Sequence, residues 1–334
     1  MVSEPVGFPG DLGRRVPPVG LNVFVSIPDA ESFAVAAREW LASVPGLLAP
    51  LEWAEVLREE KPPFSGPPVS EWPLFDGWQE PFMAWADVIV APLKWNGMLT
   101  WGRRVTGKTL QWLDGVLADR PVSAQIILRR VDANGIELPG GVGVTAEAAL
   151  GGWWAPDELI PVARLGAGDS LMWRAGARPQ DADELRGRLV SVARAWAGRA
   201  GVLGLFAGQD TARVGGTALR YSLEPRLLWE QAAVEQEREL QGYEWVTLVP
   251  AAAARLGGAA ALRESGAFWR VDELPTGGVL VQATHRMEEY DLAAARRVWE
   301  VLAPVLPAGV PARPPDWPED MPWLVIPEDA ASRR

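Results

Sequence analysis

Cysteine is absent from this chain of 334 residues, and histidine occurs once, as His285. The lack of cysteine excludes disulfides, thiolate nucleophiles and every zinc or iron–sulfur site built on cysteine. With one histidine, a His-rich metal site is impossible, and a Ser-His-Asp triad could use only His285. No G-x-S-x-G elbow supplies a serine for it. We therefore expect no catalytic residue, no metal ligand and no cofactor, and we interpret His285 as a structural or surface residue.

Long apolar runs are also missing. No stretch reaches the roughly eighteen apolar residues that a membrane helix requires. The N-terminus, MVSEPVGFPGDLGRR, lacks the apolar core of a signal peptide. The expected location is the cytoplasm, without membrane contact.

Lysine occurs only three times, as Lys61, Lys94 and Lys108. The net charge of the chain is −11. Such an acidic balance repels nucleic acid and anionic membrane, and it favours a basic protein partner through electrostatic steering. Tryptophan, in contrast, occurs 18 times. Tryptophan provides large buried surfaces and also anchors interfaces, so this count is compatible with core packing and with partner binding.

The region from Gly242 to Pro304 has the clearest organisation. A β-branched apolar run, 245–249, predicts a strand, and a short helix is expected over 251–256, ending at the pair Gly257-Gly258. Two further strands, 268–274 and 279–283, flank a Gly-containing turn. A helix with apolar residues at helical spacing then closes at Pro304.

Other parts of the chain repeat the same β-α and β-β-α units. A helix is expected between a cap at Asp29 and a stop at Pro45-Gly46, and Asp132–Gly135 is a strong hairpin turn. The remaining predicted strands cover 21–27, 85–93, 123–131, 136–144, 170–175 and 202–206, and the remaining predicted helices cover 105–117, 180–199 and 227–240. This order predicts an α+β fold with antiparallel or mixed sheets flanked by helices.

Composition divides the chain into three regions. Residues 1–120 form an N-terminal α+β region that includes a Pro/Trp-rich segment, 61–81. Residues 121–306 form a second α+β region, and residues 307–334 form a Pro-rich tail in which 323–326 is expected to dock on the body.

One sequence pattern suggests phosphate chemistry. Residues 102–109 match G-x-x-x-x-G-K-[ST], in which Gly102, Gly107, Lys108 and Thr109 would hold a phosphate. The preceding strand is short, two adjacent arginines lie inside the loop, and no later apolar run ends in the aspartate that would complete a magnesium site. Phosphate binding is therefore kept only as an alternative.

The pair Trp153-Trp154 follows two glycines and could form an exposed aromatic patch. Packing in the core is an equal interpretation. If these rings are exposed, they are binding anchors and not catalysts.

The Gly242–Pro304 region resembles the type VI secretion immunity family, long catalogued as a domain of unknown function and linked to VRR-Nuc nuclease toxins. The matching residues are Gly242, Trp245, Val246, Thr247, Ala254, Arg255, Leu256, Gly257, Gly258, Val271, Gly277, Gly278, Val279, Gln282, Ala283, Trp299, Leu302, Ala303 and Pro304. The likeness covers about a fifth of the chain. It departs from the family after Gln282-Ala283, where members often continue Gly-Pro-Arg-Pro and this chain has Thr284-His285-Arg286-Met287.

The resemblance implies an immunity protein that binds and neutralises a cognate secreted toxin, of the type VI or polymorphic kind, by covering a basic active-site surface. Acidic groups would speed association with such a surface, and aromatic groups would supply affinity. Besides Trp153 and Trp154, we expect as partner contacts the acidic residues Glu235, Glu237, Glu239, Glu288, Glu289 and Asp291.

Two other functions remain open. The protein could bind a nucleotide or phosphate through residues 102–109, or it could be a structural component of a secretion or phage-defence system. Co-purification with a toxin, bound nucleotide or self-assembly would separate the three.

Overall fold

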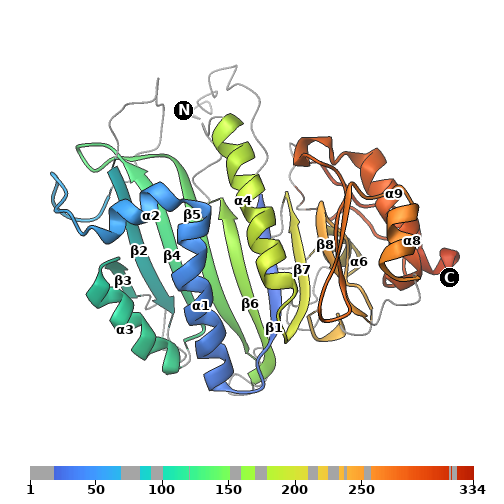
Figure 1. Cartoon of the computed structure of the whole chain (residues 1–334), viewed down its shortest axis with the longest axis horizontal. Helices are drawn as coiled ribbons and strands as arrows, with labels where there is room; N and C mark the ends of the chain where they lie inside the picture. Colours follow the sequence, from blue (N-terminus) through green and yellow to red (C-terminus); the bar gives the residue numbers. More distant parts are fainter. Residues whose placement is uncertain are drawn as a thin grey trace, which may run out of the picture.

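A computed structural model describes residues 19–68, 83–91, 101–119, 121–150, 159–169, 179–209, 217–224, 233–236, 239–251, 257–315, 317 and 322–334. Ten strands within these ranges form one sheet, in the order β3-β2-β4-β5-β6-β1-β7-β8-β10-β9 (Figure 1). Each pair of neighbours is antiparallel. The fold is α+β, as expected.

The strands are β1 (Gly20–Ser26), β2 (Met83–Ala91), β3 (Trp101–Arg104), β4 (Ser123–Val131), β5 (Glu137–Leu150), β6 (Leu159–Asp169), β7 (Val202–Gly208), β8 (Val246–Val249), β9 (Arg270–Glu273) and β10 (Val279–Gln282). The helices are α1 (Ala30–Leu48), α2 (Pro50–Leu57), α3 (Gly107–Ala118), α4 (Pro179–Ala197), α6 (Ala218–Leu223), α8 (Gly258–Glu264) and α9 (Leu292–Leu302).

A row of directly opposed apolar residues crosses the middle of the sheet and forms its core face. The row consists of Val88, Ile126, Val144, Ala167, Leu21, Ala207 and Val246, one from each of seven adjacent strands. All seven are buried. Helices α1 and α4 lie across these strands in Figure 1. Because successive side chains of a strand point to opposite faces of the sheet, the apolar side chains of each strand can share the face that these helices cover.

Helices α1 and α4 pack on each other through two tryptophans. The rings of Trp40 and Trp196 meet edge to face, with centroids 4.9 Å apart, and both are buried. Trp40 also donates from Nε1 to the carbonyl oxygen of Gly166 at 3.0 Å. This contact fixes α4 above the sheet, and α4 in turn positions the surface described below.

The sheet crosses the predicted boundary at residue 120. Strand β1, from the first expected region, lies between β6 and β7 of the second. Strands of both regions therefore share one core. The expected docking of 323–326 is confirmed, since Val325 and Ile326 are buried and the backbone N–H of Ile326 donates to the Tyr243 hydroxyl at 3.0 Å.

Most predicted elements are present with shifted ends. Helix α1 is longer than predicted, and four elements of the structure, β6, α2, α6 and α8, were not predicted. Helix α1 is capped by Asp29, as expected, but continues past Pro45 to Leu48, since Val44, Pro45 and Leu48 are buried against the core. Strand β6 was not predicted. Its sequence, LIPVARLGAGD, breaks alternation with Pro161 and two glycines.

Helix α8 was also not predicted. The glycine pair expected to end a helix instead begins one, with Gly257 at the N-cap position. The helix expected over 251–256 and the strand expected over 170–175 lie wholly or almost wholly outside the described residues, as does most of the helix expected over 227–240.

A glycine at the β6–β1 contact has a specific reason. A Cβ atom on Gly168 would lie 2.5 Å from the carbonyl oxygen of Val19 and 2.9 Å from Cα of Gly20, its partner on β1. Only glycine allows the two backbones to approach this closely.

Candidate partner-binding surface

The first two turns of α4 are the centre of the candidate site. The apolar residues Leu185, Leu189, Val192 and Trp196 recur at helical spacing and are buried, which explains why the helix forms and which side it packs. This packing leaves Asp183 and Glu184 exposed at the start of the helix. Two further structures meet this segment: the loop after β10 and a hollow beside α1 and α2.

The loop 284–291 is fastened to α4 by ion pairs. Arg286 donates to Asp183 at 2.5 Å, and Arg186 contacts both Glu288 and Asp183. Arg186 is the buried member of the group, with only 5% of its side chain exposed, so its charge is compensated almost entirely within the protein. The loop is therefore held on α4 mainly by the contact between the buried Arg186 and Glu288, because the exposed pair of Arg286 and Asp183 adds little.

An aromatic pair lies at the base of the same loop. Trp269, just before β9, is 52% exposed, and its ring meets the exposed ring of His285 with centroids 4.6 Å apart. The backbone N–H of Trp269 donates to Ala283 at 3.1 Å, which holds the two chain segments together. Our sequence reasoning missed Trp269. The sequence did contain a signal, because Trp269 directly precedes RVDE, a segment with three charged residues of the kind that are mostly exposed.

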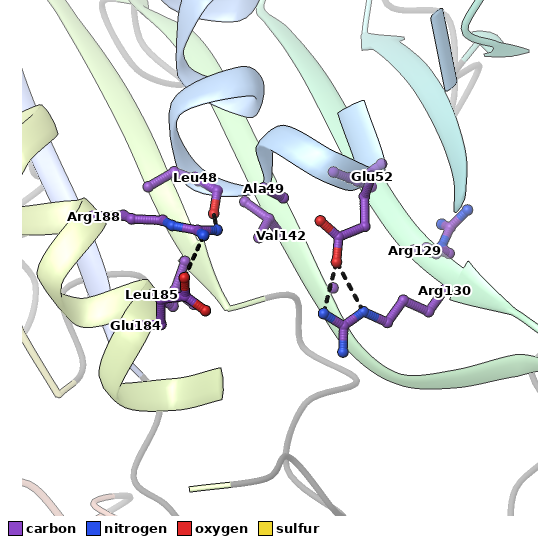
Figure 2. Close-up of a pocket in the computed structure, with 11 residues that line it drawn as sticks. Leu48, Ala49, Glu52, Arg129, Arg130, Val142, Glu184, Leu185 and Arg188 are labelled. Atoms are coloured by element: carbon purple, nitrogen blue, oxygen red, sulfur yellow. Dashed lines mark hydrogen bonds and ion pairs between the residues drawn. The ribbon is translucent and has the colours of Figure 1, made fainter. Parts of the chain in front are cut away.

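A hollow on the other side of this segment has an apolar floor between two ion pairs (Figure 2). Its volume is about 470 Å³, including the space open to solvent at its mouth. Buried apolar side chains form the floor, and they are Leu48, Ala49, Leu128, Val142 and Leu185.

The two ion pairs face each other across that floor. On one side Arg130 donates from Nε and Nη2 to Glu52 Oε1 at 3.1 and 2.7 Å. On the other side Arg188 donates to Glu184 at 2.6 Å and to the carbonyl oxygen of Leu48, at the end of α1, at 2.8 Å. Arg129, in contrast, points away from the hollow in Figure 2 and contacts Asp87 and Glu137.

The predicted acidic contacts are mostly engaged within the chain. Glu235 contacts Arg220 at 2.9 Å, Glu239 contacts Arg334 at 2.5 Å, and Glu288 contacts Arg186. Glu289 accepts from the backbone N–H of Arg286, and Asp291 caps α9 by accepting from Ala294 at 2.8 Å. The structure brings Glu288, Glu289 and Asp291 into one loop, whereas Glu235 and Glu239 lie on a separate segment. Glu237, Trp153 and Trp154 lie outside the described residues.

Residues 102–109 form an edge strand followed by a capped helix. Thr106 caps α3 by accepting from the Thr109 N–H at 3.1 Å, and the Thr109 hydroxyl donates to the Arg104 carbonyl at 2.7 Å. The Gly107 N–H donates to Glu59 at 2.5 Å. A carboxylate therefore already occupies the place where this helix terminus would receive a phosphate, while Gly102 and Lys108 are exposed. The geometry favours the capping interpretation.

Two tyrosines under the site are strongly perturbed. Burial raises the pKa of Tyr243, although its hydrogen bond with Ile326 opposes the shift. Burial, reinforced by the charge of Glu244, also raises the pKa of Tyr290 well above its usual value. Both groups stay protonated at neutral pH, so their hydroxyls serve packing and hydrogen bonding. Within the described ranges, no group of three or more histidine, aspartate or glutamate residues could hold a metal ion.

No family model matches the chain, and no curated protein matches it. Among solved structures, the chain is similar to one described as "Pseudomonas aeruginosa T6SS protein PA0821", with 13% sequence identity and a TM-score of 0.43, over 92% of this chain and 81% of that chain. A likeness at this level carries no argument about function, so the resemblance of Gly242–Pro304 to the immunity family stays a hypothesis. None of the helices in the described part of the chain is both long and apolar enough to span a membrane.

Proposed function

We propose that the protein is an immunity protein, which binds a cognate secreted toxin through the loop 284–291 and the neighbouring Trp269. The observation that carries this proposal is the exposed Trp269–His285 pair, at the loop where the chain departs from the family it resembles. Variation at one exposed, well-supported loop is what a binder needs if related proteins must each recognise a different toxin.

The physical properties of this surface support binding. Tryptophan and arginine are the residues that most often dominate interface energetics, because they bring large contact areas and directional donors. Here Trp269 and Arg286 are both about half exposed. Since ion pairs to Asp183 and Arg186 already fix the loop, little conformational entropy is lost on binding.

Net charge supports the choice of partner. A protein with a charge of −11 attracts a basic surface at long range, and a nuclease that binds nucleic acid has such a surface. The nuclease class comes from the resemblance alone. Glu288 contributes less to this attraction than an unpaired glutamate would, because it forms ion pairs with Arg186 and Arg286.

The test is a binding measurement with the protein encoded by the adjacent gene. Trp269→Ala should weaken the complex by about thirtyfold or more, as for other central interface tryptophans. Trp101→Ala is the matched control, because Trp101 is 47% exposed on β3 at the opposite edge of the sheet. Equal affinities of the two variants, or no complex at all with a toxic neighbour, would contradict the proposal.

Two other outcomes point to the other functions. Self-assembly without a partner would favour a structural component of a secretion or phage-defence system. Bound nucleotide in the purified protein would favour phosphate binding at residues 102–109.

A further inference from the structure

We propose that the hollow between α1, α2 and α4 binds the C-terminal residue of a partner protein, with an aliphatic side chain on the apolar floor and the terminal carboxylate on Arg188. This proposal rests on the proposed function in one respect only, because it takes the molecule that binds in the hollow to be a partner protein.

Arg188 is the group that would receive the carboxylate. Its contact with the Leu48 carbonyl aims the guanidinium at the hollow, as Figure 2 shows. Its carboxylate partner, Glu184, lies one turn away on the same helix and has 64% of its side chain exposed. Such an exposed pair is weak and easily exchanged. A guanidinium has five N–H donors, so an incoming carboxylate can bind it in a forked arrangement without displacing Leu48.

The opposite rim can recognise the main chain of the same residue. Both bonds from Arg130 to Glu52 end on Oε1. In the described structure Oε2 of Glu52 is thus available to accept the backbone N–H of the incoming residue. A carboxylate acceptor on one side and a guanidinium on the other match the N–H and the carboxylate of a C-terminal residue in polarity.

The floor selects the side chain. Leu48, Leu128, Val142 and Leu185 offer only apolar atoms, so a charged side chain would be desolvated there without a partner. An aliphatic side chain such as leucine avoids this penalty and covers the floor.

Two exposed leucines next to the lining residues in the chain argue for a protein and against a free small acid. Leu47 and Leu51 directly precede the lining residues Leu48 and Glu52 in the chain, and they are 50% and 80% exposed. A small molecule inside the hollow would leave these leucines in water. A polypeptide that ends in the hollow continues outside it, and where it passes along the adjoining ends of α1 and α2 it can cover them.

The experiment uses the full-length protein and no toxin, so its failure is distinct from failure of the proposed function. N-acetyl-leucine is titrated and followed by chemical shifts of α4 and α2 amides. We expect saturable binding, about tenfold weaker for N-acetyl-leucinamide and for Arg188→Gln, since each loses a charge-assisted contact. Glu184→Gln should bind more tightly, and Arg199→Gln, farther along the same helix-turn segment, should bind like the wild type. No saturable binding, equal binding of acid and amide, or full binding by Arg188→Gln would overturn the site.

A second arm separates a protein end from a free acid. A hexapeptide that ends in leucine with a free carboxylate should bind several-fold more tightly than N-acetyl-leucine. Leu51→Ser should reduce this gain and leave N-acetyl-leucine binding unchanged. A hexapeptide that binds no better than the amino-acid derivative would overturn the assignment to a partner protein.

Discussion

Arg286 donates to Asp183 at 2.5 Å across 103 positions of the sequence, and this bond joins the loop after β10 to the start of α4. Together with the contact between Arg186 and Glu288, it alternates positive and negative charges along the junction. The acidic residues of this loop therefore have a structural role that the amino-acid sequence alone did not reveal. Any effect of their mutation on partner binding must be separated from an effect on loop position.

Glu288→Ala should destabilise the protein by about 1–3 kcal/mol, because Arg186 is buried and would lose a charged partner. The control is Glu264→Ala at an exposed position of α8, which should change the free energy of unfolding by less than about 0.5 kcal/mol. Chemical unfolding measures both. If the two variants were equally stable, Glu288 would not be needed to compensate the buried charge of Arg186.

Removal of the side-chain hydroxyl should have opposite effects on the free energy of unfolding at Tyr243 and at Tyr290. Among the described residues the buried hydroxyl of Tyr290 has no hydrogen-bond partner, whereas that of Tyr243 accepts from Ile326. Tyr290→Phe should therefore raise the free energy of unfolding by about 1 kcal/mol, and Tyr243→Phe should lower it by a similar amount. A loss of stability in Tyr290→Phe would show that its hydroxyl is satisfied in solution.

The raised pKa values of the same two tyrosines predict how the free energy of unfolding changes at alkaline pH. Burial raises the pKa of both in the folded protein above the ordinary value of 10.0. Above about pH 10 the unfolded chain releases these protons while the folded protein retains them, so the free energy of unfolding falls as pH rises toward the folded pKa. Urea unfolding between about pH 8 and 11 should show a shallower fall for Tyr290→Phe than for the wild type. An unchanged slope would contradict the raised pKa.

Gly242 belongs to the resemblance motif, and its neighbour explains why glycine stands there. A Cβ at this position would collide with the side chain of Thr217, which caps α6 and donates to the Gln241 carbonyl at 2.7 Å. Gly242→Ala should cost about 1–3 kcal/mol through this overpacking. Gly187→Ala is the matched control in α4, where a Cβ meets nothing within 4 Å, and it should instead stabilise by about 0.5–1 kcal/mol. Thermal unfolding of the two variants in opposite directions is the expected result.

Local signals in the sequence predicted the elements that depend on neighbouring residues. Asp29 accepts from Ser32 as a helix cap, and Asp132 accepts from Asn134 and Ile136 in the hairpin turn. Strand β6 was missed, because its glycines serve contacts with β5 and β1 that no local pattern records. The hollow could not be predicted for the same reason. Arg130 reaches Glu52 across 78 positions, and Arg188 reaches Leu48 across 140.

Residues 102–109 match a phosphate-loop pattern and also contain the N-cap of α3, and these two interpretations lead to a paired test. If the pattern is a helix cap, Thr106→Ala should cost about 1 kcal/mol, because the Thr109 N–H loses its acceptor. Lys108→Ala should change the free energy of unfolding by less than about 0.5 kcal/mol, since Lys108 is exposed. A calorimetric titration with ATP and magnesium should show no saturable heat for the wild type or either variant. Saturable binding that Lys108→Ala abolishes would instead establish a phosphate site, and it would require Glu59 to leave the Gly107 N–H when nucleotide binds.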